Sequence, residues 1–119
     1  MHEATIAQSI LDLAASKLEQ IGGYNIALKI CVKIGQFRNV DNHSLDFAFE
    51  SLKSMYAGFE SCRLEAQSVK AEAWCREGNH RYNPCFENAF CCERCGSGIG
   101  KIICGEELEF VDLITEAGN

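Results

Sequence analysis

The sequence predicts an α+β fold: a small mixed sheet with two helices and an inserted zinc-ribbon-like knuckle. Three observations lead to this prediction. Apolar residues recur at helical spacing in two segments, residues 26–34 place a large apolar side chain at every second position, and residues 75–100 carry Cys, Gly and Asn with little periodicity. The expected order is helix, strand, helix, strand, the cysteine-rich insert and two closing strands.

The first helix is expected at residues 6–21. Thr5 and Gln8 form a capping box at its start, because the Thr hydroxyl can accept a backbone N–H and the Gln side chain can reach back. The pair Gly22-Gly23 ends it. The first four residues are therefore expected outside the helix. The apolar face consists of Ile6, Ile10, Leu13, Ala14, Leu18 and Ile21.

The clearest strand is residues 26–34. Its two lysines, Lys29 and Lys33, fall on one face, and the large aliphatic side chains fall on the other. Gly35 ends the strand, and a loop over 36–43 follows. The aliphatic face is Ile26, Leu28, Ile30, Val32 and Ile34.

The second half of the chain completes the predicted fold. A helix is expected from Ser44 to Ala57, with Leu45, Ala48, Phe49, Leu52 and Tyr56 on its apolar face. The remaining strands are expected at 63–73, 101–104 and 107–115, the last two joined by a turn at Gly105-Glu106. These elements divide the chain into two predicted parts: an α+β domain formed by 1–73 plus 101–119, and an inserted module at 74–100.

Length and charge exclude several classes of protein. The chain has 119 residues and a formal net charge of −6, enough for one domain with a small module. A nucleic-acid binder would carry a basic surface, and the acidic balance also disfavours docking on an anionic membrane. No apolar run approaches the roughly 20 residues that span a bilayer. No signal peptide is recognised either, so a cytoplasmic protein is expected.

Eight cysteines indicate metal binding in this chain. Cys92-Glu-Arg-Cys95-Gly96 is half of a zinc knuckle, and Cys75 supplies a third thiolate. A fourth cysteine would be expected at position 78, where the chain has Gly78. His80 is the first candidate for the fourth ligand, Cys85 is the alternative, and Cys91 ranks last because it adjoins Cys92.

The metal is expected to hold the insert together, because about twenty residues with few apolar side chains cannot fold on burial alone. The other cysteines, Cys31, Cys62 and Cys104, lie in or next to predicted strands. They are expected to be small packing residues and not ligands.

The whole chain resembles the HypA/HybF family of hydrogenase nickel-incorporation proteins. The resemblance rests on the start Met1-His2-Glu3, the strand end Lys33-Ile34-Gly35, the helix Leu45-Asp-Phe-Ala-Phe-Glu50, and Cys75 followed by Cys92-x-x-Cys95. Gly78 is a departure, because the family has a cysteine there.

The resemblance implies a nickel metallochaperone, not an enzyme. Its cargo would be Ni(II) for maturation of [NiFe]-hydrogenase, in some organisms also for urease, beside a structural Zn(II). The implied partners are the GTPase HypB, the hydrogenase large-subunit precursor and, for urease, its accessory proteins. The implied nickel residues are Met1, His2 and Glu3, with Asp41 where some relatives have an acidic residue near nickel.

Coordination chemistry agrees with that implication. Ni(II) favours a square-planar or tetragonal field of nitrogen and oxygen donors. The Met1 amine, the His2 backbone and ring nitrogens and the Glu3 backbone nitrogen are joined by short covalent paths, so they can close adjacent chelate rings. Asp41 can add an axial oxygen if its loop comes close. The alternative for Asp41 and His43 is a solvated loop.

Two other functions agree with parts of the sequence. A zinc-ribbon interaction module without a nickel role would keep the insert and be indifferent to the N-terminus. A thiol redox enzyme is disfavoured, because Cys95-Gly-Ser-Gly shows no helix after the C-x-x-C pair. Monomer and homodimer both remain open from the sequence.

Overall fold

The computed structural model describes residues 2–118. Its internal contacts divide the chain into two units. The helical unit comprises the residues up to Lys33, 40–67, and those from Glu109 onward. The cysteine module comprises Ile34–Asn39 and Ser68–Leu108. None of the described helices is long and apolar enough to span a membrane.

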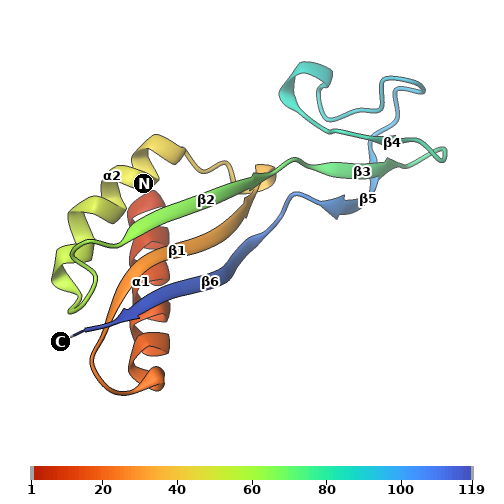
Figure 1. The fold of residues 1–119 in the computed structure, drawn as a ribbon. Helices are drawn as coiled ribbons and strands as arrows, with labels where there is room; N and C mark the ends of the chain where they lie inside the picture. The colour runs from red at the N-terminus through yellow and green to blue at the C-terminus, as the bar shows by residue number, and fades with distance from the viewer. Residues whose placement is uncertain (1, 119) are drawn as a thin grey trace. The chain divides into compact units, whose positions relative to one another are not determined.

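The helical unit contains two helices and a three-stranded sheet (Figure 1). The strand order is β2-β1-β6. β1 and β2 run in the same direction and β6 runs opposite to them, so the sheet is mixed, as predicted (Figure 1). The two helices pack against each other. The bounds are α1 His2–Ile21, β1 Asn25–Gly35, α2 Asn42–Leu52, β2 Arg63–Val69 and β6 Leu108–Ala117.

The start of α1 corrects the sequence prediction. The helix begins at His2, so Thr5 is its fourth residue and not its cap. An acidic side chain in the first turn favours this earlier start, because Glu3 faces the positive end of the helix dipole. The buried face also differs from the predicted one, since Leu13 is 45% exposed and Leu11 is fully buried. The buried residues of α1 are Ala7, Ile10, Leu11 and Ala14.

The prediction for β1 is partly right. Ile30, Val32 and Ile34 are buried as expected. At the start of the strand Ala27 is fully buried, whereas its large neighbours at 26 and 28 are only half-buried. The backbone N–H of Ala27 donates a hydrogen bond to the carbonyl of Gly58, at 2.9 Å.

The helix α2 begins two residues earlier than predicted and ends earlier as well. Asp41 caps it, and beyond Leu52 the chain tightens into the 3-10 helix η2, Lys53–Met55. Leu45 and Phe49 are buried, as their spacing predicted.

The cysteine module contains a second three-stranded sheet, in the order β4-β3-β5. Both strand pairs are antiparallel. The single strand predicted at 63–73 is therefore wrong: the chain leaves one sheet at Val69 and enters the other at Glu72. Its elements are η1 Gln36–Arg38, β3 Glu72–Cys75, β4 Arg81–Tyr82, η3 Phe86–Asn88 and β5 Ile99–Cys104.

Gln36 explains why residues 34–39 belong to the module and not to the helical unit. Its side-chain oxygen accepts the backbone N–H of Ala71 at 3.0 Å and the amide of Asn83 at 2.9 Å. Its side-chain nitrogen donates to the carbonyl of Pro84 at 2.8 Å. The contact-defined module is thus larger than the 74–100 insert expected from the sequence.

Candidate metal centre

Four side chains of the cysteine module converge on one point: Cys75, His80, Cys92 and Cys95. Their ligand atoms all lie within 4.8 Å of one another. Cys75 is the last residue of β3, His80 directly precedes β4, and the other two cysteines lie in the turn before β5. The structure therefore brings together the four side chains that the sequence ranked first.

The distances fit a tetrahedral zinc ion. With Zn–S near 2.3 Å and Zn–N near 2.0–2.1 Å, a tetrahedron places two sulfurs about 3.8 Å apart and a sulfur and a nitrogen about 3.6 Å apart. The His80 Nδ1 atom is 3.6 Å from the Cys75 sulfur and 3.7 Å from the Cys92 sulfur. The sulfurs of Cys95 and Cys75 are 3.7 Å apart. The donor set and its spacing suit zinc.

Electrostatics at the cluster favour thiolates. Burial alone would raise the pKa of the Cys75 thiol, but hydrogen bonds from the backbone N–H groups of His80 and Gly78, and from the Cys95 and His80 side chains, lower it to about 6. Hydrogen bonds from the Ser97 hydroxyl and backbone lower the pKa of Cys95. The pKa of His80 is raised by its hydrogen bonds to Cys95 and Cys75. Thiolate is the form that binds a metal.

The backbone of the C-x-x-C turn is closed by short hydrogen bonds. The Cys92 N–H donates to the Ser97 carbonyl at 2.8 Å, and the Gly96 N–H donates to the Cys92 carbonyl at 2.7 Å. Gly96 has a φ of +75°, a conformation that a side chain disfavours. This glycine therefore lets the turn bring both sulfurs to the same side.

Gly78 lies at the edge of the cluster. A Cβ atom there would be 3.4 Å from the His80 ring and 3.6 Å from the Cys75 sulfur. The imidazole of His80 thus occupies the place next to position 78, where the family pattern has a thiol.

The alternative fourth ligands lie outside the cluster. The Cys85 sulfur accepts the N–H of residue 88 and caps η3. The Cys91 sulfur contacts the Ala89 carbonyl at 3.4 Å. Among the other cysteines, Cys62 is fully buried, and burial raises its pKa to about 11, as suits a packing residue. Ligation by His80 remains a prediction that the geometry supports.

The N-terminal residues predicted for nickel lie in the helical unit. Met1 falls outside the described residues. His2 and Glu3 form the first turn of α1, and the His2 Nε2 atom is 3.7 Å from a carboxylate oxygen of Glu3. That carboxylate accepts the backbone N–H of Asp41 at 3.0 Å. This hydrogen bond, a bond to the Glu3 backbone and the charge of His2 lower the pKa of Glu3, despite some desolvation.

The backbone of Asp41 lies close to Glu3 in the first turn of α1. The Asp41 carboxylate, however, accepts the His43 N–H at 3.0 Å and the Ser44 hydroxyl at 3.1 Å, and so caps α2. His43 is exposed. The carboxylate beside His2 is that of Glu3. Its hydrogen bond to the Asp41 backbone was not predicted from the sequence, because this contact spans 38 residues.

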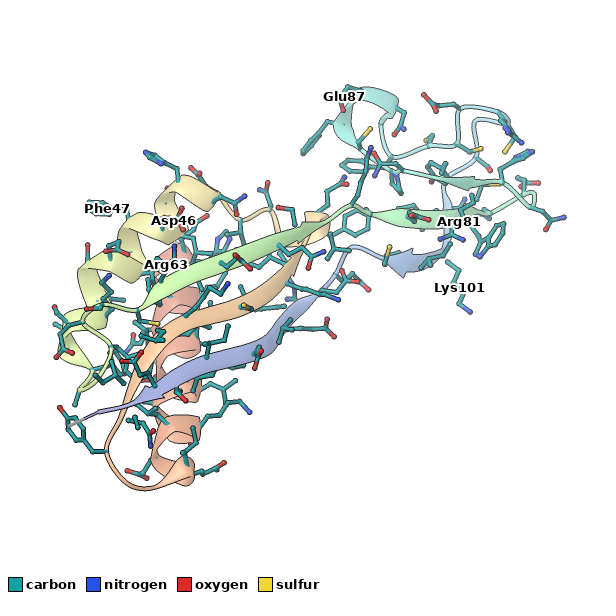
Figure 2. All side chains as sticks on the ribbon, in the orientation of Figure 1. Asp46, Phe47, Arg63, Arg81, Glu87 and Lys101 are labelled. Carbon is teal, nitrogen blue, oxygen red and sulfur yellow. The ribbon has the colours of Figure 1, made fainter. Side chains whose placement is uncertain are left out.

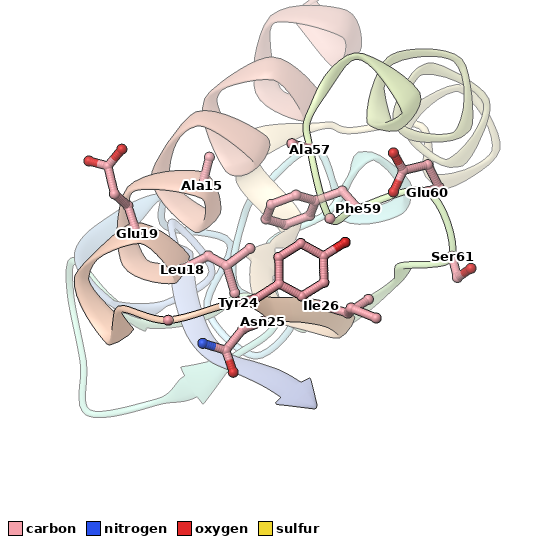
Figure 3. A pocket seen from close by; sticks show the side chains of 12 residues that line it. Ala15, Leu18, Glu19, Tyr24, Asn25, Ile26, Ala57, Phe59, Glu60 and Ser61 are labelled. Atoms are coloured by element: carbon pink, nitrogen blue, oxygen red, sulfur yellow. The ribbon is translucent and has the colours of Figure 1, made fainter. Parts of the chain in front are cut away.

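A hollow at the far end of α1 offers no comparable donor set (Figure 3). Leu18, Tyr24 and Phe59 line it, with Glu19 and Glu60 at its rim. It has neither His nor Cys among its lining residues, so we assign no metal to it.

Comparison with known proteins decides the family. The family described as "Hydrogenase/urease nickel incorporation, metallochaperone, hypA" matches residues 1–114. The chain belongs to the HypA family of nickel metallochaperones for hydrogenase maturation. The departure at Gly78 therefore lies within a HypA chain and not in an unrelated zinc ribbon.

Individual relatives agree over nearly the full length. The hydrogenase maturation factor HypA of Aeromonas hydrophila is 30% identical, and the match covers 95% of this chain and 97% of that protein. The hydrogenase maturation factor HybF of Klebsiella pneumoniae is 27% identical over 95% of this chain and 97% of that protein. The solution structure of the Ni metallochaperone HypA from Helicobacter pylori has the same fold, with a TM-score of 0.67, 23% identity, and coverage of 99% and 100%. The predicted α+β class is confirmed.

Proposed function

We propose that this HypA-family chain binds its nickel cargo at the N-terminus. The donors would be the Met1 amine, the His2 backbone and ring nitrogens and the Glu3 backbone nitrogen. The observation that carries the proposal is the exposed His2 ring beside the Glu3 carboxylate in the first turn of α1. The His2 N–H is among the first four of the helix, which have no acceptor within it.

An acidic oxygen next to this turn would complete the site. The Glu3 carboxylate stands nearest to the imidazole, and Asp41 is held beside it by the hydrogen bond between the Asp41 N–H and Glu3. Both residues line an open hollow between α1 and α2. Nickel in this place would be reachable for transfer.

The zinc site is proposed to be structural. Zn(II) would be held by Cys75, His80, Cys92 and Cys95, and its role would be to fold the module. With three thiolates and one imidazole, the site would carry one negative charge. A catalytic zinc would need an open coordination position, whereas four protein ligands converge here.

The proposed setting is the cytoplasm. The partners would be the GTPase HypB, the hydrogenase large-subunit precursor and, where urease is present, its accessory proteins. A homodimer is also compatible with the proposal. The protein would act by handing over an ion, without catalysis of its own.

Adding one Gly before Met1 tests the nickel site. The extension turns the Met1 amine into an amide, which must lose a proton before it can bind. Calorimetry with Ni(II) should show at least tenfold weaker binding, about 1.4 kcal/mol, with zinc content unchanged.

His2→Ala should weaken nickel binding to a similar extent. His43→Ala is the matched control, because His43 is also exposed but lies at the start of α2. If the extended protein binds nickel as tightly as the native one, the amine is not a ligand. The proposed N-terminal site would then be rejected, and the nickel ligands of this HypA-family chain would have to be sought elsewhere.

A further inference from the structure

The open face of the module sheet carries an exposed tryptophan between two cations. Trp74 in β3 pairs directly with Arg81 in β4 and with Lys101 in β5. Side chains directly opposite each other in antiparallel strands lie on the same face. The three side chains therefore form one row across the sheet, which we name the Trp74 row.

The opposite face of the same sheet is the packed one. Ala73, the neighbour of Trp74, is fully buried and pairs with Tyr82 and Ile102. Trp74 itself is 40% exposed, and Ile103 on β5 is 38% exposed. A large aromatic side chain next to an aliphatic one is an unusual use of solvent-facing positions in a short sheet.

The charges around the tryptophan are specific to this face. Arg81 and Lys101 are both exposed and project from the strands on either side of β3 (Figure 2). Arg81 also forms an ion pair with Glu72 in β3, which orients the guanidinium along the sheet. Among residues 2–118 the Lys101 ammonium forms no ion pair, so the row has a net positive charge.

That positive charge stands out against the rest of the chain. The helical unit has eleven acidic and five basic side chains, whereas the cysteine module has six of each. The acidic excess therefore lies entirely in the helical unit, and the module presents the place where an acidic partner would meet least repulsion.

We propose that the Trp74 row is a docking surface for an acidic, extended segment of a partner protein that carries an aromatic or aliphatic anchor. The anchor packs on the Trp74 indole and Ile103, and carboxylates on either side pair with Arg81 and Lys101. Trp and Arg are the side chains most enriched at the energetic centres of interfaces. A nucleic acid would also suit a basic aromatic row, but the two cations of this row are few for the many phosphate contacts on which nucleic-acid affinity rests.

The surface can be tested without nickel, so its failure leaves the proposed nickel site untouched. The probe is the peptide acetyl-Glu-Asp-Glu-Phe-Leu-Asp-Glu-amide, titrated into the zinc-loaded full chain. Trp74 is the single tryptophan, so its emission reports binding directly. The expected result is saturable binding that weakens with added salt, and no binding of the analogue with Lys in place of each acid.

Two charge reversals provide the matched comparison. Lys101→Glu should weaken peptide binding at least tenfold. Arg63 is also exposed but lies at the start of β2 in the helical unit, so Arg63→Glu should change peptide affinity less than twofold (Figure 2). Trp74→Leu, followed by anisotropy of a labelled peptide, should also weaken binding at least tenfold. Zinc content checks that each variant keeps a folded module.

Several results would overturn the proposal. One is failure of the acidic peptide to bind the native chain. Another is an equal loss of binding in Lys101→Glu and Arg63→Glu. A third is a ten-nucleotide oligothymidine that binds more tightly than the peptide and displaces it, which would assign the row to nucleic acid. A fourth is self-association abolished by Lys101→Glu without peptide binding, which would assign it to a second copy of the chain.

Discussion

The helical unit and the cysteine module bury different kinds of side chain. The helical unit buries large apolar side chains, among them Leu11, Ile30, Leu45, Phe49 and Phe59. In the module fewer large side chains are buried: the fully buried ones include Ala71, Ala73 and Pro84, and two more of its buried residues, Cys75 and Cys92, belong to the candidate zinc site. One chain thus combines a unit with a large hydrophobic core and a module for which we propose stabilisation by a bound zinc ion.

The largest expected effect is the loss of zinc from the module. Structural zinc sites contribute roughly 10–16 kcal/mol of apparent binding free energy near neutral pH, and that energy is folding energy. Removal by a chelator should abolish amide-exchange protection in β3 and β5 while α1 and β1 stay protected. Retained protection in β3 without metal would show that the module folds by burial after all.

Acidification, like zinc removal, should destabilise the cysteine module before the helical unit. A thiol whose folded pKa is lowered stabilises the fold above its ordinary value near 9, and this contribution declines with falling pH and is gone below about 6, the pKa of Cys75. Protons also compete with zinc for the thiolates below that pH. Zinc should therefore be released below about pH 6.

The helical unit should resist the same acidification. The lowered pKa of Glu3 means that its carboxylate contributes fully above its ordinary value of 4.5 and is lost only as the pH falls further. Far-ultraviolet circular dichroism and zinc release should thus show two separate transitions. A single transition for both signals would contradict independent stabilisation.

Phe49→Ala should have the opposite effect: it should destabilise the helical unit and leave the cysteine module unchanged. Phe49 is 1% exposed, and truncation of such a core residue costs about 3–5 kcal/mol. Urea unfolding should show that loss while zinc content stays unchanged. Phe47→Ala is the control on the same helix, because Phe47 is 75% exposed and its change should stay within about 0.5 kcal/mol.

The smallest expected effect is a gain, from Gly78→Cys. The new Cβ atom would lie in contact range of the cluster, so the thiolate can replace the His80 imidazole. X-ray absorption should change from three sulfurs and one nitrogen to four sulfurs, and zinc should compete against a chelator up to about tenfold better, roughly 1.4 kcal/mol. His80→Ala alone should lose zinc, and Gly78→Cys in that background should restore it. An unchanged spectrum would mean that the loop cannot deliver a thiol from position 78.

Local patterns in the sequence predicted many features of this structure. The buried Ile30, Val32 and Ile34 of β1 follow from alternation, and Leu45 and Phe49 follow from helical spacing. The grouping of His80 with three cysteines follows from the ligand chemistry and the spacing of four residues in one loop region.

Long-range contacts explain the errors. In the first turn of α1, which begins at His2, the Glu3 carboxylate accepts a hydrogen bond from the backbone of Asp41. At the break of the predicted strand 63–73, the backbone N–H of Ala71 donates a hydrogen bond to the Gln36 side chain. Neither partner is near in sequence, so no local period signals it.

The placement of residues 34–39 has a consequence for how such a protein can be rearranged by genetic events. The backbone passes between the two units four times, at 33/34, 39/40, 67/68 and 108/109. A deletion of 68–108 would therefore leave Gln36 and Phe37 behind without the groups they bind, including the Gly105 carbonyl that accepts the Phe37 N–H at 2.8 Å. The module is not a cassette that recombination could insert or excise in one piece. Any lineage that lost residues 68–108 would have to rebuild the end of β1 as well.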